Sequence, residues 1–148
     1  MTNEEYEDPQ EDAQADQQEE SLALLMELAE TASKKKGFDI VAFELTNLAS
    51  FTDYFLVVSA KNPRAAKAIA EEIKHVVRHK MNISMIGIEG LEACSWILVD
   101  VPGVVVHVFE EKKRGFYNLE GLWQDAPRVE LPVFESEQSE LPELFFPG

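Results

Sequence analysis

The sequence predicts a mixed α/β domain in which about five strands form a mixed sheet with flanking helices. Two apolar runs, 95–101 and 104–109, flank Pro102-Gly103, a dipeptide that suits the centre of a tight turn, so they predict an antiparallel hairpin. A predicted strand, a long helix and another strand follow one another over 54–89, and this order favours a right-handed crossover between parallel strands. Parallel and antiparallel pairing then coexist in one sheet.

The first predicted helix runs from Ser21, a favourable N-cap residue, to about Lys36, and Gly37 closes it. Its apolar stripe consists of Leu22, Leu25, Met26 and Ala29. The three lysines at 34–36 then lie at the C-terminus of the helix, where cations favour the helix dipole, and we prefer this interpretation to phosphate binding.

Two strands and a second helix follow. Phe38–Leu45 and Tyr54–Ala60 are predicted strands, separated by a loop of small and polar residues. Asn62-Pro63 supplies an N-cap and a first-turn proline for a helix that runs to about Lys80. The apolar residues at helical spacing are Ala65, Ala68, Ile69, Ile73, Val76 and Val77.

The remaining predicted elements are a strand and a short helix on either side of the hairpin. Ile83–Glu89 is a third strand before the hairpin. Asn118 is expected to cap a final helix that carries Leu119, Leu122 and Trp123 and ends at Asp125-Ala126-Pro127.

The acidic charge lies mainly at the two ends of the chain. The 148 residues carry 28 acidic and 13 basic side chains, a formal net charge of -15. Residues 1–20 hold nine acidic and no basic residues and 130–148 hold five and none, which leaves 14 acidic and 13 basic residues in 21–129. We therefore expect a disordered acidic tail at 1–20, one folded domain at 21–129 and an acidic, proline-containing tail at 130–148. A nearly neutral domain has no long-range attraction to nucleic acid.

The sequence also bears on the compartment. No apolar run reaches the roughly 18 to 20 residues of a membrane span, so we expect no membrane contact. The acidic N-terminus resembles neither a secretory signal nor a transit peptide, and we expect a cytoplasmic protein. Cys94 is the one cysteine, which predicts an inert thiol and no intrachain disulfide.

Catalytic motifs are missing from the sequence. There is no phosphate-binding loop, dinucleotide fingerprint, zinc-protease motif or nucleophile elbow. His75 and His79 have metal-ligand spacing without a third ligand, so we expect neither metal nor cofactor. Asp53 and Asp100 are the candidates for a magnesium site, but no closely spaced acidic pair accompanies them. His107, inside an apolar strand, is expected to be a satisfied, half-buried histidine and not a catalytic base.

Ordered blocks across about residues 22–127 resemble one known family. The blocks are Ser50–Phe55, Arg64, Lys67–Ala70, Glu89-Gly90, Trp96–Asp100, Val104–Phe109, Arg114, Phe116-Tyr117, Leu119-Glu120, Leu122-Trp123 and Asp125–Pro127. On these blocks the chain resembles the Iojap-like ribosomal silencing factors. Pro102-Gly103 stands where that family usually has Gly-Asp.

The resemblance implies a nucleotidyltransferase-like fold without the catalytic motif, and a function that needs no cofactor. It further implies binding to the large ribosomal subunit through its fourteenth protein, with ribosomal RNA at most a secondary contact. Such binding blocks association with the small subunit and represses translation when nutrients are short. The alternatives are a nucleotidyltransferase-like enzyme that binds nucleotides, and a scaffold that forms a homodimer through an uncovered apolar sheet face.

A tryptophan and an aspartate lie on one face of the predicted strand 96–101. Trp96 offers a large, rigid anchor and Asp100 one polar contact, which is the composition of binding hot spots. From the residues alone, Trp96 as a core side chain is the stronger interpretation, whereas the resemblance favours an interface. The predicted partner-binding residues are Trp96, Leu98, Asp100 and Val101, and the predicted supporting residues are Asp53, Tyr54, His107 and Tyr117.

Overall fold

A six-stranded mixed sheet forms the centre of the molecule in a computed structural model, which describes residues 9–134. The strands are β1 (Phe38–Glu44), β2 (Tyr54–Ala60), β3 (Gly87–Glu89), β4 (Trp96–Val101), β5 (Val104–Glu110) and β6 (Arg128–Val129). Their order across the sheet is β3-β4-β5-β2-β1-β6. The predicted mixed α/β class is confirmed, with one strand more than expected.

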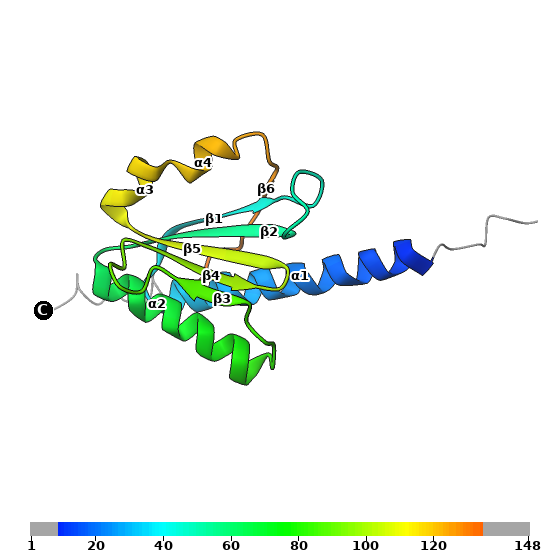
Figure 1. Cartoon of the computed structure of the whole chain (residues 1–148), viewed down its shortest axis with the longest axis horizontal. Helices are drawn as coiled ribbons and strands as arrows, with labels where there is room; N and C mark the ends of the chain where they lie inside the picture. The colour runs from blue at the N-terminus through cyan, green and yellow to red at the C-terminus, as the bar shows by residue number, and fades with distance from the viewer. Residues whose placement is uncertain (1–8, 135–148) are drawn as a thin grey trace, which may run out of the picture.

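Helices cover the two faces of the sheet unequally. The helical segments are α1 (Pro9–Lys34), α2 (Pro63–His75), the π-helical turn η2 (Val76–Lys80), α3 (Glu111–Tyr117) and α4 (Leu119–Leu122). The long helices α1 and α2 lie along one face, and the short α3 and α4 lie over the other (Figure 1). The helical layers are therefore extensive on one side of the sheet and small on the other.

The pairing of the strands follows the predicted mixture. β4 and β5 form an antiparallel hairpin around Pro102-Gly103, with Trp96 opposite Phe109 and Val101 opposite Val104. β2 and β5 pair in parallel over seven residue pairs. β3 pairs antiparallel with β4 and so runs in the same direction as β2, as expected for strands joined through a helical crossover.

Helix α1 begins at Pro9 and not at the predicted cap Ser21. Ser21 lies inside the helix and is buried, and its Oγ donates to Asp53 Oδ2 at 2.8 Å. Leu22, predicted on the apolar stripe, is exposed. The buried apolar residues of α1 are Leu24, Leu25, Leu28, Ala29 and Ala32. A serine is compatible with the middle of a helix when its hydroxyl has a tertiary partner, so its N-cap preference did not set the boundary.

The C-terminus of α1 also differs in detail from the prediction. Lys36, with a φ of 72°, is the left-handed residue that ends the helix. Gly37 donates its N–H to the Ala32 carbonyl at 2.8 Å. A Cβ at Gly37 would lie 2.6 Å from Val58 Cγ1, so the glycine allows the chain to pass close to β2.

Helix α2 starts as predicted, whereas the strand after it is shorter. Asn62 Oδ1 accepts from the N–H of Ala65 at 2.8 Å, which confirms the N-cap. The predicted strand Ile83–Glu89 is reduced to Gly87–Glu89. The N–H of Ile83 donates to the Val77 carbonyl at 2.9 Å, so this part of the segment folds back onto the end of the helix. Ile83 and Met85 pack against the core without joining the sheet, whereas Ile86 is exposed and donates its N–H to the Asp100 carbonyl at 2.9 Å.

A helix that was not predicted, α3, precedes the last short helix. The carboxylate of Glu110 accepts from the N–H of Lys112 at 3.2 Å and caps α3. Asn118 has a φ of 50° and ends α3. Its side chain makes no cap hydrogen bond, so the predicted side-chain cap of the last helix, α4, does not form. Asparagine tolerates this left-handed conformation better than most residues.

The packed part of the chain reaches beyond the predicted domain limits of 21 and 129. Gln18 in α1 donates to Glu44 Oε2 at 3.4 Å. Leu131 and Phe134 are partly buried and pack against the core on the side of α1 and α2. Residues 135–148 of the predicted C-terminal tail, which include the apolar run 144–146, lie outside the described residues. Within residues 9–134, no helix is long and apolar enough to cross a membrane.

The hairpin turn yields a test of the backbone. Gly103 has a φ of 92°, and a Cβ there would collide with Ser21 of α1. We expect Gly103→Ala to lower the free energy of unfolding by about 1–3 kcal/mol, because an L residue is strained at this φ. The measurement is chemical denaturation of the full chain.

Gly115→Ala is the matched control for this substitution. Gly115 lies inside α3, and a Cβ added to it would meet no atom within 4 Å, so alanine there should stabilise the protein by up to about 1 kcal/mol. Equal destabilisation by the two substitutions would contradict the account of the turn.

Candidate partner-binding surface

Strand β4 separates a covered face from an open one. Ile97 and Val99 are fully buried on the side of α1 and α2. Trp96, Leu98 and Asp100 lie on the opposite face and are each half-buried. The alternation is that of a strand with one solvated face. Because α3 contacts β5 and β2 more than β4, this part of the sheet stays partly accessible.

Val101 does not belong to the open face. It is 1% exposed and lies in the core with Ile97 and Val99. Its place among the partner-binding residues is therefore corrected. The reason is the two-residue period of a strand, which puts Val101 and Asp100 on opposite faces.

Trp96 is held by three aromatic neighbours. Its indole Nε1 donates to Nδ1 of His107 at 3.1 Å. Its ring stacks on Phe109 with centroids 5.0 Å apart and lies 4.7 Å from the ring of Tyr117. The structure thus brings three predicted site residues together: Trp96, His107 and Tyr117. A half-exposed indole in such a setting is a rigid contact surface.

His107 is more deeply buried than the sequence suggested. It is 3% exposed, and burial lowers its pKa to about 4, so the ring is neutral at pH 7. Its Nδ1 has the Trp96 indole as partner, whereas Nε2 has no hydrogen-bond partner among the described residues. The edge contact with Phe55, at a centroid distance of 4.5 Å, closes its other side. A side chain enclosed in this way has no access to a substrate.

Two carboxylates border the aromatic residues on the open face. Asp100 lies opposite Gly87, and Leu98 lies opposite Glu89, so Glu89 shares the face with Leu98 and Asp100. Burial, with a further contribution from Glu89, raises the pKa of Asp100 above its ordinary value of 3.8. No described side chain donates a hydrogen bond to this carboxylate. The cross-strand register that places Glu89 here could not be obtained from the sequence.

Helix α3 adds exposed aromatic side chains to the same surface. Tyr117 is 40% exposed and Phe116 is 77% exposed, with their rings 5.2 Å apart. Lys113 Nζ lies 5.7 Å from the Phe116 ring centroid. We use the name Trp96 surface for the set Trp96, Leu98, Asp100, Glu89, Phe116 and Tyr117. Exposed aromatic side chains in contact with one another are typical of interaction sites.

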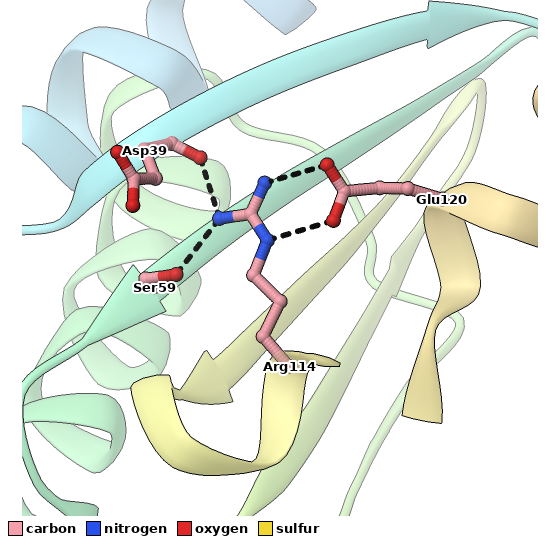
Figure 2. Close-up of polar contacts among 4 residues, drawn as sticks. All are labelled: Asp39, Ser59, Arg114 and Glu120. Carbon is pink, nitrogen blue, oxygen red and sulfur yellow. Dashed lines mark hydrogen bonds and ion pairs between the residues drawn. The ribbon is translucent and has the colours of Figure 1, made fainter. Parts of the chain in front are cut away.

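Arg114 fixes α3 and α4 to the sheet (Figure 2). Its Nε and Nη2 donate to the two carboxylate oxygens of Glu120 at 2.9 and 3.0 Å. Its Nη1 donates to Ser59 Oγ at 2.8 Å and to the carbonyl of Asp39 at 2.6 Å. Asp39 has a φ of 50° and lies at the β-bulge of β1, between Phe38 and Val41, where the register of β1 on β2 shifts. Arg114 therefore joins α3, α4, β1 and β2 through one guanidinium group.

Asp53 and Tyr54 support the hairpin from the other end of the sheet. Their backbone N–H groups donate to the Gly103 carbonyl at 3.2 and 3.1 Å. Tyr54 is buried on the side of α1, and burial, followed by the charge of Glu44, raises its pKa above 10.0. The structure places both residues away from the aromatic cluster around Trp96. Their contacts join β2, α1 and the β4–β5 turn.

The candidate catalytic groups do not converge. Asp53 accepts from Ser21, whereas Asp100 lies on the open face of β4. Cys94 lies in the core on the side of α1 and α2, whereas His107 lies on the other side of the sheet. The Sγ of Cys94 donates to the Leu91 carbonyl at 3.1 Å. In the part of the chain that the structure describes, no three side chains of His, Cys, Asp or Glu are grouped as a metal site.

The sequence comparison decides the family. Residues 18–143 match the profile of the family described as ribosomal silencing factor during starvation. The chain belongs to this family. The match covers the sheet, most of α1, the other helices and the whole Trp96 surface, so the predicted resemblance is confirmed.

Individual relatives and solved structures agree with this assignment. The chain is 40% identical to the ribosomal silencing factor of Halalkalibacterium halodurans over 108 residues, 72% of this chain and 92% of that protein. It is 32% identical to the chloroplastic Iojap protein of Arabidopsis thaliana over 126 residues, 85% of this chain and 52% of that protein. A crystal structure from Bacillus halodurans superposes with a TM-score of 0.65 at 35% identity, covering 76% of this chain and 99% of that one.

The Arg114–Glu120 pair gives a pH-dependent prediction. The hydrogen bond with Arg114 lowers the pKa of Glu120 below its ordinary value of 4.5. The pair therefore stabilises the fold fully above pH 4.5, and its contribution is lost as the pH falls through the folded-state pKa. We expect Glu120→Gln to lower the free energy of unfolding at pH 7 by about 1–2 kcal/mol, a range reduced for partial exposure of the pair.

Denaturation of wild type and Glu120→Gln between pH 7 and pH 3 measures this difference, which should shrink at the acid end. Glu92→Gln, at an exposed glutamate in the turn before β4, is the matched control and should change stability little at any pH. A Glu120→Gln difference that stays constant down to pH 3 would show that the charge of Glu120 is not responsible.

Proposed function

We propose that this protein binds the large ribosomal subunit through the fourteenth protein of that subunit, with the Trp96 surface as the contact. Membership of the silencing-factor family supports a ribosomal target. The observation that carries the location is the rigid, half-exposed Trp96 on the uncovered face of β4. Bound to the large subunit in this way, the protein would stand between the two subunits, block their association and repress translation under nutrient limitation.

The chemistry of the surface favours a basic protein partner. Its centre is aromatic and aliphatic, and Asp100 and Glu89 at its edge carry negative charge. Carboxylates attract the lysine and arginine side chains of a ribosomal protein and repel RNA phosphates. Lys112 and Lys113 on α3 are exposed at another part of the surface, where a secondary contact with ribosomal RNA would fit. We place this activity in the cytoplasm, with the ribosomes.

The binding energy should depend on Trp96. We expect Trp96→Ala to weaken binding by about 2 kcal/mol or more, the scale of a hot-spot truncation. The free energy of unfolding should fall by much less than the roughly 3–5 kcal/mol expected for a fully buried tryptophan. Asp100→Asn should weaken binding at nearly constant volume, because it removes the charge that meets the basic partner. Affinity for the isolated ribosomal protein and for large subunits, together with unfolding midpoints, measures both effects.

The matched control is Leu22→Ala, at an exposed apolar residue of α1 on the other side of the sheet, which should leave binding unchanged. Light scattering on the same samples tests whether the free protein forms a homodimer through the Trp96 surface and whether the ribosomal protein displaces the second copy. A Trp96→Ala protein that blocks subunit association at the wild-type concentration would move the interface to another part of the molecule.

We also propose that the protein is not an enzyme and uses no cofactor. The relatives carry the name of a regulatory factor, and the two aspartates of the alternative nucleotidyltransferase-like function lie apart in the fold. We expect no magnesium-dependent incorporation or hydrolysis of any nucleoside triphosphate by the purified protein. Turnover that Asp53→Asn or Asp100→Asn abolishes would establish the enzymatic alternative.

A further inference from the structure

The hydrogen bond between Trp96 and His107 connects the exposed surface to the interior of the sheet. The indole Nε1 of Trp96 donates to His107 Nδ1 at 3.1 Å, and His107 itself is 3% exposed. We propose that His107 is a positioning residue of the Trp96 surface, which fixes the indole in its binding orientation before a partner arrives. This inference rests on the proposed function, because it assigns a role to a residue behind that surface.

The donor of this bond determines the tautomer of the histidine. An indole nitrogen can only donate, so Nδ1 must accept and the proton of the neutral ring is on Nε2. Burial keeps the ring neutral, since it lowers the pKa of His107 to about 4. A protonated ring would carry an N–H on each nitrogen and would lose the bond to Trp96. The acceptor is therefore present throughout the neutral pH range.

The second ring nitrogen indicates that packing alone does not explain the histidine. Nε2 is buried and has no hydrogen-bond partner within residues 9–134, a condition that destabilises a fold. An apolar ring at this place would pack against Phe55 and Phe109 without that cost. What only the histidine supplies here is an acceptor for the indole of Trp96.

The aromatic neighbours restrict the indole in the remaining directions. Phe109 stacks against one side of it at an interplanar angle of 28°, and Tyr117 packs against it at a centroid distance of 4.7 Å. Stacking alone permits an in-plane rotation, and a directional hydrogen bond to His107 prevents it. A side chain that is already fixed loses less conformational entropy on binding, so His107 should increase affinity without touching the partner.

Two substitutions of His107 in the full chain separate the acceptor from the ring. His107→Phe keeps an aromatic ring and removes the acceptor. His107→Asn removes the ring and keeps an oxygen close to the position of Nδ1, so it should fold less stably and still accept from the indole. The chain has two tryptophans, and Trp123, whose ring packs against Phe55, is the internal reference.

Nitrogen-15 NMR of the free protein reads the bond directly. We expect the Trp96 indole N–H to shift and to exchange faster with solvent in His107→Phe, to stay bonded in His107→Asn, and the Trp123 signal to change little. In the wild type, the histidine ring signals should show the neutral form with its proton on Nε2. The opposite tautomer in the wild type would overturn the proposal without any variant, even if a variant failed to fold.

Binding to large subunits and to the isolated ribosomal protein then tests the consequence. We expect His107→Phe to weaken binding by about 2- to 10-fold, the effect of ordering one side chain, and His107→Asn to bind more tightly than His107→Phe in spite of its lower stability. Wild-type affinity of His107→Phe, or an unchanged Trp96 signal in it, would overturn the positioning role. Wild-type protein that binds no large subunits would refute the proposed function instead, while the NMR result would still report the bond.

Discussion

The parallel pairing of β2 with β5 is the constraint on which the rest of the fold depends. All seven residues of each strand are buried, so both faces of this pair must be covered. Parallel neighbours also need a crossover, and the chain makes it through α2, β3 and β4 before it returns along β5. Because β4 belongs to this connection and pairs with β5 on the side away from β2, it lies outside the central pair, where the small second helical layer leaves the face with Trp96, Leu98 and Asp100 accessible.

The second helical layer is small, and polar contacts add to its apolar packing on the sheet. Phe55, Val105 and Leu119 form part of its core, which has far fewer buried residues than the core beneath α1 and α2. Arg114 compensates through a bidentate ion pair and two further hydrogen bonds, among them one to the Asp39 carbonyl at the β-bulge of β1. The orientation of α3, and with it the position of Tyr117 against Trp96, thus depends on one largely buried arginine side chain.

Local signals in the sequence were sufficient for much of the fold and for part of the surface. The Pro-Gly hairpin and the Asn62 cap depend on residues next to one another in the chain, and both were predicted. Ser21 and Asn118 are both favourable N-cap residues, but neither caps a helix with its side chain. Ser21 instead bonds to Asp53 from inside α1, and Asn118 takes the left-handed conformation that ends α3. Glu89 belongs to the surface only because of the register of β3 on β4, which the sequence does not determine. The His107–Trp96 hydrogen bond depends on the orientation of two side chains on neighbouring strands, which the alternation of apolar residues does not determine either.

The negative charge of the Trp96 surface favours a basic protein over a second copy of this chain as the proposed partner. In a two-fold dimer each copy presents the same patch, so an interface through this face would contain four carboxylates, Asp100 and Glu89 from each copy. Asp100 already has a raised pKa from burial and from Glu89, and further desolvation beside like charges would destabilise its ionised form more. A basic partner would instead place a cationic side chain beside Asp100. No described residue of the free protein forms an ion pair with this carboxylate. The charges that border the aromatic centre therefore favour the basic ribosomal protein proposed above over a second copy of this chain.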